Sequence, residues 1–217
     1  MAQYEKPDRW SLRAQKEGYP ARSVYKLEEL GEKFGLLRLP GDGGTFRALD
    51  LGAAPGSWSL YILRKLGKRC LLTAADLSPL SRRYDRGLFD GENCRFIQGD
   101  MTAPEIREAI LALGPFNLVM SDAAPATTGN RSVDALRSLE LAEAALGYAE
   151  TALVKGGNFI VKVFQGGETA SALKRIRELF RAAKSCKPEA CRGNSFETYY
   201  VGLGRKDALA QDPRTKS

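Results

Sequence analysis

The chain has 217 residues, of which 43% are hydrophobic, and these values suit one globular domain with or without a short appendage. It contains no histidine, which excludes Ser-His-Asp and Cys-His mechanisms and histidine-ligated metal sites. Its formal net charge is +7, and residues 171–217 alone hold 11 basic against 5 acidic side chains. Such a surplus suggests a polyanionic partner, although many soluble proteins carry a similar charge.

Other features narrow the class of protein further. No apolar run approaches the roughly 20 residues that span a bilayer, and the first residues show no signal-peptide pattern. The four cysteines have no spacing typical of a zinc site. We therefore expect a cytoplasmic protein without a membrane segment and without a metal.

The first 40 residues predict a helical extension. One helix is expected over residues 8–16, with Asp8 as its cap, and a second over 22–34, where apolar residues recur at helical spacing. A Pro/Gly-rich stretch at 39–44 separates them from the main domain, which we place at 41–206. The polar residues 207–217 are expected to form a disordered tail.

Strand-like and helix-like segments alternate through the main domain. The strands are expected at 46–50, 70–75, 94–98, 116–121, 157–164 and 197–203, with a further candidate near 183–187. The helices are expected at 57–66, 104–113, 132–154 and 169–181. This alternation predicts an α/β fold with a doubly wound, mostly parallel sheet and helices on both faces.

A glycine turn over residues 50–58 reads Asp-Leu-Gly-Ala-Ala-Pro-Gly-Ser-Trp, directly after the first strand. Gly52 and Gly56 remove Cβ atoms where a ligand would touch the backbone. Their spacing does not match the G-x-G-x-x-G pattern of pyrophosphate sites, and no P-loop lysine follows. The turn suits a nucleoside with amines and hydroxyls, such as S-adenosylmethionine (SAM). The alternative is a tight turn in an ordinary α/β domain.

An acidic residue follows each of the first four strands. Because ligands bind at the carboxyl ends of parallel strands, these acids favour a nucleoside site. Asp76 can accept ribose hydroxyls, and Asp100 can accept from an adenine amine. Each acid taken alone could equally cap a helix or form a turn. The four residues are Asp50, Asp76, Asp100 and Asp122.

Lys162 lies within the most strand-like run of the chain. Lysine is almost never fully buried without a partner, although it can snorkel from a strand edge. Glu197, in another strand, poses the same problem. We therefore expect Lys162 and Glu197 to pair, together with Asp122, at a functional site.

These motifs resemble the FtsJ (RrmJ) methyltransferases, which methylate a ribose 2′-hydroxyl of ribosomal RNA. The resemblance runs from residue 22 to about 206 and rests on the segments 22–27, 50–58, 119–125, 161–166 and 187–197. It implies a Rossmann-like SAM-dependent methyltransferase fold with a seven-stranded sheet. Ser57 stands where the family usually has glycine, and Cys191 where serine is common.

The resemblance also implies a Lys-Asp-Lys-Glu catalytic set, which falls on Lys26, Asp122, Lys162 and Glu197. No other feature of the sequence singles out Lys26 as a catalytic residue. Lys162 is the expected proton acceptor. This role requires a neutral amine, whereas a lysine with the usual pKa of about 10.4 is protonated at neutral pH. Together with the glycine turn and the acid series, the resemblance predicts SAM contacts at Asp50, Gly52, Ala53, Pro55, Gly56, Ser57, Trp58, Asp76, Leu77, Asp100, Met101 and Asp122.

The implied substrate is a uridine of large-subunit ribosomal RNA, modified by a monomeric enzyme. RNA phosphates would be contacted by basic residues in two regions, namely Arg9, Arg13, Lys16, Arg22, Arg192 and Arg205. The alternatives are methylation of transfer RNA or another RNA, of a small molecule or protein, or a non-catalytic ribosome-assembly role.

Overall fold

A computed structural model describes residues 8–41, 43–166, 169–193 and 195–207 of the chain. Almost all of the tail expected at 207–217 lies outside these residues. No helix in the described ranges is long and apolar enough to cross a membrane.

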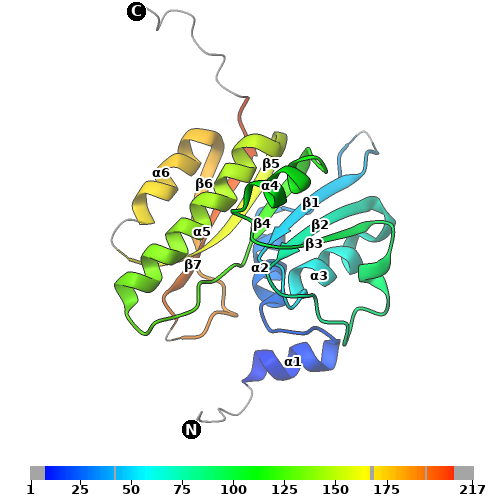
Figure 1. Ribbon diagram of the computed structural model, residues 1–217, viewed down its shortest axis with the longest axis horizontal. Helices are drawn as coiled ribbons and strands as arrows, with labels where there is room; N and C mark the ends of the chain where they lie inside the picture. The colour runs from blue at the N-terminus through cyan, green and yellow to red at the C-terminus, as the bar shows by residue number, and fades with distance from the viewer. Residues whose placement is uncertain (1–7, 42, 167–168, 194, 208–217) are drawn as a thin grey trace, which may run out of the picture.

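The two N-terminal helices form where the sequence predicts them. Helix α1 spans Arg9–Glu17, and the Asp8 side chain accepts a hydrogen bond from the backbone N–H of Ser11 at 2.9 Å. Helix α2 spans Val24–Phe34. Figure 1 shows α1 at the edge of the molecule, outside the sheet.

The main domain contains a seven-stranded sheet with the order β3-β2-β1-β4-β5-β7-β6. Its strands are β1 (Phe46–Leu51), β2 (Cys70–Asp76), β3 (Cys94–Gln98), β4 (Phe116–Ser121), β5 (Leu153–Phe164), β6 (Phe180–Cys186) and β7 (Glu197–Arg205). The first five strands pair in parallel, whereas β7 runs antiparallel between β5 and β6. The predicted doubly wound, mostly parallel sheet is confirmed.

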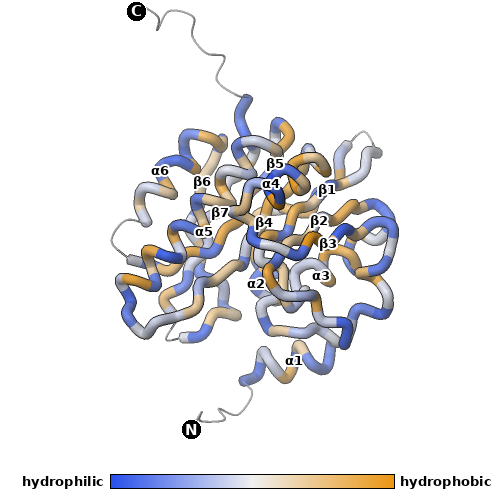
Figure 2. Tube along the Cα trace, in the orientation of Figure 1, coloured by the Kyte–Doolittle hydropathy of each residue, from blue (hydrophilic) through white to orange (hydrophobic). Residues whose placement is uncertain are grey.

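Helices cover both faces of this sheet, and each face has its own apolar core. The helices of the main domain are α3 (Ser57–Leu66), α4 (Pro104–Leu111), α5 (Arg131–Ala152) and α6 (Thr169–Leu179), with short 3₁₀ turns η1 (Gly67–Arg69) and η2 (Leu88–Asp90). Helices α2 and α3 pack on one face, and α4, α5 and α6 on the other. Hydropathy follows this arrangement, with apolar strands inside polar helix surfaces (Figure 2).

The largest differences from the predicted boundaries lie at the starts of β5 and β6, and the other boundaries differ by at most two residues. The helix expected to reach residue 154 ends at Ala152, and β5 begins at Leu153 rather than at 157. Strand β6 begins at Phe180, inside the helix expected over 169–181. The Phe180 ring is buried and stacks on Phe159 of β5 with ring centroids 6.0 Å apart. This tertiary contact favours the strand over one more turn of helix.

Alternation along two strands turns the candidate catalytic side chains toward one face. Ile160 of β5 belongs to the core beneath α2 and α3, whereas its neighbours Phe159 and Val161 belong to the other core. Lys162, two residues after Ile160, shares its face. Tyr199 of β7 lies opposite Lys162 in the antiparallel register, in the same core as Ile160. Helix α2, which carries Lys26, covers this face.

Gly202 of β7 tests the packing of the Phe180 ring of β6 against the sheet. A Cβ atom at Gly202 would lie 2.6 Å from the buried ring of Phe180. We expect Gly202→Ala to lower the free energy of unfolding by about 1–3 kcal/mol, because the ring must shift in a close-packed core. Denaturant unfolding measures the change. The control Gly41→Ala, where nothing lies within 4 Å of the added Cβ, should stay within about 0.5 kcal/mol. Equal losses in both variants would contradict the packing argument.

Candidate active site

A cavity of about 1000 Å³ opens at the carboxyl ends of the parallel strands. Its position follows from the topology, since β1 and β4 are neighbours where the strand order reverses. The residues that line it come from the strand ends, the following loops and one side of α5. They are Gly52, Ala54, Ala75, Asp76, Leu77, Ser78, Gly99, Asp100, Met101, Thr102, Asp122, Ala123, Ala124, Pro125, Ala126, Arg137, Glu140 and Leu141.

The glycine turn passes close to the loop that follows β4. Gly52 has a φ of +71°, and a Cβ on it would lie 2.5 Å from the Cβ of Ala123. Any larger residue would therefore clash as well as strain the backbone. The Asp76 carboxylate accepts a hydrogen bond from the N–H of Ala54 at 2.9 Å, which joins the turn to the end of β2. These contacts hold the turn open beside the cavity.

The acids at the strand ends give the cavity its chemical character. Asp100 accepts from the backbone and side chain of Thr102, both at 2.8 Å, and these bonds lower the pKa of its carboxyl group. The pKa of Asp122 is also lowered, so both groups are ionised at neutral pH. A cavity lined by carboxylates repels phosphate and suits a ligand with hydroxyl, amine and cationic groups. SAM has this chemistry, and the residues present therefore fit it.

Asp50 lies at the end of β1, where its side chain is almost completely buried. The hydroxyl of Ser59 donates to its carboxylate at 2.7 Å. Burial, together with the nearby charges of Asp122 and Asp76, raises the pKa of Asp50 to about 7 in spite of this hydrogen bond. With Ala53, it lines a second, much smaller cavity against the turn. Asp50 therefore lies behind the turn rather than in the large cavity.

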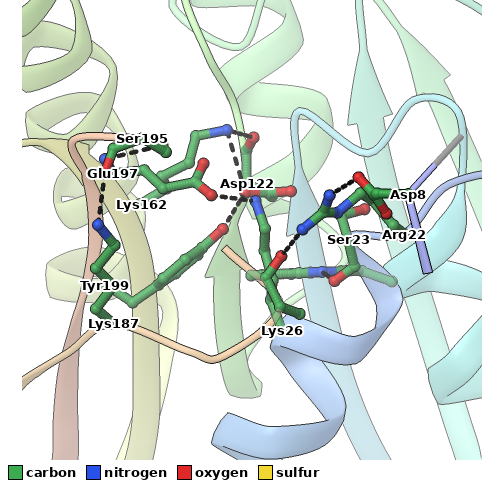
Figure 3. A network of polar contacts seen from close by, with 12 residues as sticks. Asp8, Arg22, Ser23, Lys26, Asp122, Lys162, Lys187, Ser195, Glu197 and Tyr199 are labelled. Carbon is green, nitrogen blue, oxygen red and sulfur yellow. Dashed lines mark hydrogen bonds and ion pairs between the residues drawn. The ribbon is translucent and has the colours of Figure 1, made fainter. Parts of the chain in front are cut away.

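Asp122 and Lys162 form a buried ion pair at the end of the sheet. The Lys162 Nζ atom lies 3.1 Å from Asp122 Oδ1 and donates to the Asp122 carbonyl oxygen at 2.5 Å. The hydroxyl of Tyr199 donates to the same Oδ1 atom at 2.6 Å. Figure 3 shows both side chains directed at the carboxylate. Asp122 thus holds the lysine and the tyrosine together while it faces the large cavity.

Glu197 pairs with Lys26 and not with Lys162, so the expected Glu197–Lys162 pair is wrong. The Lys26 Nζ atom lies 2.9 Å from Glu197 Oε1, and both side chains are nearly buried. Glu197 lies opposite Phe164 in the strand register, two positions from Tyr199, which lies opposite Lys162. Helix α2 brings the second lysine to the carboxylate. Sequence spacing alone did not show that an element so distant would supply the partner.

Electrostatics favour the charged forms of Asp122 and Lys26 in this cluster. Burial by itself would raise the pKa of Asp122, but the ammonium groups of Lys162 and Lys26 outweigh it and the pKa is lowered. Burial by itself would lower the pKa of Lys26, but the carboxylates of Asp122 and Glu197 outweigh it and the pKa is raised. The two acids and two lysines therefore balance one another in a site that excludes most water.

The residues expected to contact SAM fall into three groups. Six line the large cavity: Gly52, Asp76, Leu77, Asp100, Met101 and Asp122. Four line only the small cavity behind it, namely Asp50, Ala53, Ser57 and Trp58, and two of the first six, Gly52 and Asp122, line both cavities. Pro55 and Gly56 are absent from both linings. A Cβ on Gly56 would lie 2.8 Å from the Phe89 ring, so this glycine permits close packing beneath the turn.

Of the basic residues expected to contact RNA, Arg205 lies apart from the others. Arg9, Arg13 and Lys16 are exposed on α1, and Arg192 is exposed in the loop before β7. Arg22 binds the Asp8 carboxylate and the carbonyl oxygen of Ala190. Arg205 is the last residue of β7, eight residues beyond Glu197 or about 26 Å at the usual rise of a strand. Figure 1 shows that β7 ends on the side of the molecule away from α1. Arg205 donates to the carbonyl oxygens of Glu150 and Leu153.

The sequence analysis missed two parts of the site, namely Tyr199 and one side of α5. Tyr199 is fully buried, and burial next to Asp122 raises its pKa well above 10. Its position two residues after Glu197 placed it on the same strand face, a signal that could have been read. Arg137, Glu140 and Leu141 of α5 line the large cavity. Only tertiary packing brings this helix to the strand ends.

Comparisons with known proteins give a consistent result. The family model of the FtsJ-like methyltransferases matches residues 19–205. A ribosomal RNA large subunit methyltransferase E from Treponema denticola is 51% identical, with 94% of this chain and 97% of that protein covered. A protein of the same name from Borreliella afzelii is 43% identical, with 90% and 96% covered.

Solved structures also resemble the chain. A ribosomal RNA methyltransferase from Plasmodium falciparum matches with a TM-score of 0.70 and 26% identity, covering 86% of this chain and 98% of that one. Aeropyrum pernix fibrillarin, solved with natively bound S-adenosyl-L-methionine, matches with a TM-score of 0.53 and 17% identity, covering 83% and 76%. The second likeness shows the fold alone.

The buried Asp50 predicts a specific dependence of stability on pH. Its pKa is about 7 in the folded chain and about 3.9 in an unfolded one, so the folded state holds the extra proton between these values. Stability therefore falls as the pH rises from about 4 to about 7, by up to about 4 kcal/mol from this group, and changes no further above that range. We expect Asp50→Asn, which can still accept from Ser59, to remove this loss. Unfolding measured across this pH range would contradict the assignment if the two curves ran parallel.

Proposed function

Because this chain belongs to the FtsJ-like methyltransferase family, we propose that it transfers a methyl group from SAM to a ribose 2′-hydroxyl of ribosomal RNA. The proposed target is a uridine of the large subunit. The names of its relatives support the large subunit, and the uridine follows from the family resemblance. One observation carries the proposal most directly. A buried Lys162–Asp122 pair adjoins a carboxylate-lined cavity that is large enough for SAM and suits its chemistry.

The cavity residues divide the binding of SAM among them. SAM, when bound, supplies an activated methyl group. Asp76 and Asp100 would accept hydrogen bonds from the nucleoside, and Gly52 lets the backbone approach the ligand. Asp122 would attract the cationic end of the molecule, since its carboxylate borders the cavity and stays ionised. Ala53, Pro55 and Gly56 would shape the turn.

Lys162 is the proposed proton acceptor for the ribose hydroxyl. Its Nζ atom lies 3.1 Å from the carboxylate of Asp122, which borders the large cavity. Asp122 and Tyr199 fix the position of this atom. Holding the reacting groups in this way reduces the entropy cost of the transfer. Lys26 and Glu197 would orient the ribose from the other side of the cluster.

The RNA would reach the site across the exposed basic residues of α1 and Arg192. A ribosomal substrate would place the protein in the cytoplasm, and we propose that it acts as a monomer. Transfer to another RNA is the alternative, because the geometry of the site does not distinguish one RNA from another. The complete cluster of Lys26, Asp122, Lys162 and Glu197 argues against a non-catalytic assembly factor, because burying four charges costs stability that binding alone would not require.

Lys162→Met tests the catalytic assignment. The variant keeps the length of the side chain but cannot accept a proton. We expect transfer from labelled SAM to unmethylated large ribosomal subunits to fall at least about 100-fold, the usual range for loss of an acid–base group. SAM binding by calorimetry should change little, because Asp122 and Tyr199 remain. The exposed strand residue Lys184 gives the control Lys184→Met, which should retain full transfer.

Two results would count against the proposed function. Full transfer by Lys162→Met would remove the lysine from the reaction. Label that is lost on alkaline hydrolysis, instead of surviving in one dinucleotide, would show that the methyl group is not on a ribose 2′-oxygen. Label appearing only in transfer RNA would keep the chemistry and change the substrate.

The salt dependence of RNA binding tests the role of α1. We expect the double variant Arg9→Ala with Lys16→Ala to weaken RNA binding and to lower the slope of log K against log salt by about 1.4–1.8, the value for two lost phosphate contacts. Filter binding at several salt concentrations measures this slope. Lys155→Ala, at the start of β5, provides a matched exposed control. An unchanged slope in the α1 variant would exclude α1 from the RNA interface.

A further inference from the structure

Two residues at the start of α3, Ser57 and Trp58, make their polar contacts with the N-terminal segment. Both side chains are 2% exposed. The backbone N–H of Ala21 donates to Ser57 Oγ at 2.9 Å, and the Ser57 hydroxyl donates to the Ala21 carbonyl at 3.2 Å. Serine therefore closes a two-bond link that glycine, the usual residue of the family at this position, could not make.

Trp58 makes the second link, and it ends at the turn that holds Lys26. Its indole Nε1 donates to the carbonyl oxygen of Ser23 at 2.8 Å. The same oxygen accepts the backbone N–H of Lys26 at 3.0 Å. One carbonyl, with two lone pairs, thus joins α3 to the backbone of the catalytic lysine.

The first turn of α2 needs such support from outside. Ser23 occupies the N-cap position of α2, but its side chain makes no capping hydrogen bond. Lys26 lies in the first turn, where a helix frays most readily. Its ammonium group must nevertheless stay within 2.9 Å of Glu197. Small rotations of an unsupported first turn would move that ammonium group out of contact.

Trp58 also touches the other half of the cluster. Its ring centroid lies 6.0 Å from that of Tyr199, the residue that donates to Asp122. Lys26 Nζ lies 5.7 Å from the centroid of the same tyrosine ring. The indole therefore contacts both the Ser23 carbonyl, which binds the backbone of Lys26, and the Tyr199 ring, whose hydroxyl donates to Asp122.

We propose that Trp58 and Ser57 are positioning residues that hold Lys26 in the catalytic cluster, so that the cofactor turn and the first turn of α2 form one rigid unit. The proposal rests on the proposed function, because it assigns Lys26 a role in RNA methylation. It gives the two side chains a role toward the substrate side of the site, distinct from contact with SAM.

Trp58→Phe tests the proposal, since phenylalanine keeps an aromatic ring against Tyr199 and removes the indole N–H. We expect the single-turnover rate of transfer to fall about fivefold to tenfold, as expected for the loss of one hydrogen bond, while the dissociation constant of SAM changes less than twofold. The control Tyr61→Phe, on the same helix, removes a hydroxyl that accepts from Lys65 and should leave the rate unchanged. Ser57→Ala should lower the rate in the same direction as Trp58→Phe and serves if that variant does not fold.

A double-mutant cycle separates positioning from general destabilisation. In a Lys26→Met background, Trp58→Phe should have no further effect on the rate, because the group that it positions is gone. Equal losses in both backgrounds would overturn the proposal. So would a loss in SAM affinity that matches the loss in rate.

Hydrogen exchange gives a readout that does not depend on transfer. In the protein without SAM or RNA, Trp58→Phe should increase exchange over residues 21–27, and Tyr61→Phe should not. This result also decides the case in which the wild-type protein or Lys26→Met shows no transfer. Wild-type inactivity would overturn the proposed function, whereas unchanged exchange over 21–27 would overturn the positioning role.

Discussion

Charge balance in a buried place is the constraint on which the rest of this site depends. Two acidic and two lysine side chains meet where water is largely excluded, and each is tolerated there because a side chain of the opposite type lies against it. Asp122 is at the centre, since it contacts Lys162 and Tyr199 and lowers the cost of burying Lys26. Removing one member would leave its partner without an opposing charge, at a cost in stability.

The topology of the sheet serves this constraint. The order β1-β4-β5-β7 sets the glycine turn, Asp122, Lys162 and Tyr199 side by side across four neighbouring strands. The antiparallel entry of β7 brings Glu197 to the same end as the parallel strands' carboxyl termini. Helix α2 then closes the face with Lys26. The cofactor cavity and the charged cluster consequently share one residue, Asp122. Through this residue, a ligand bound in the cavity can affect the cluster.

Local pattern was sufficient for the strands, the glycine turn and the acids at the strand ends, because burial and alternation leave direct traces in the sequence. It was insufficient where a partner comes from a distant element. Lys26 looks like any charge on a helix, and only family resemblance singled it out. Glu197 was assigned the wrong lysine because register and helix docking decide which of two cations it meets. The start of β6 at Phe180 likewise depends on a ring in another strand.

The position of β7 has a consequence for the way the protein is made. Among the described strands β7 comes last in the sequence, yet it pairs with both β5 and β6 and carries Tyr199 and Glu197. Until β7 has been made, β5 and β6 therefore have unpaired edges, and the charged cluster lacks one of its four members and the tyrosine that donates to Asp122. Completion of the sheet and completion of the cluster thus depend on the same strand.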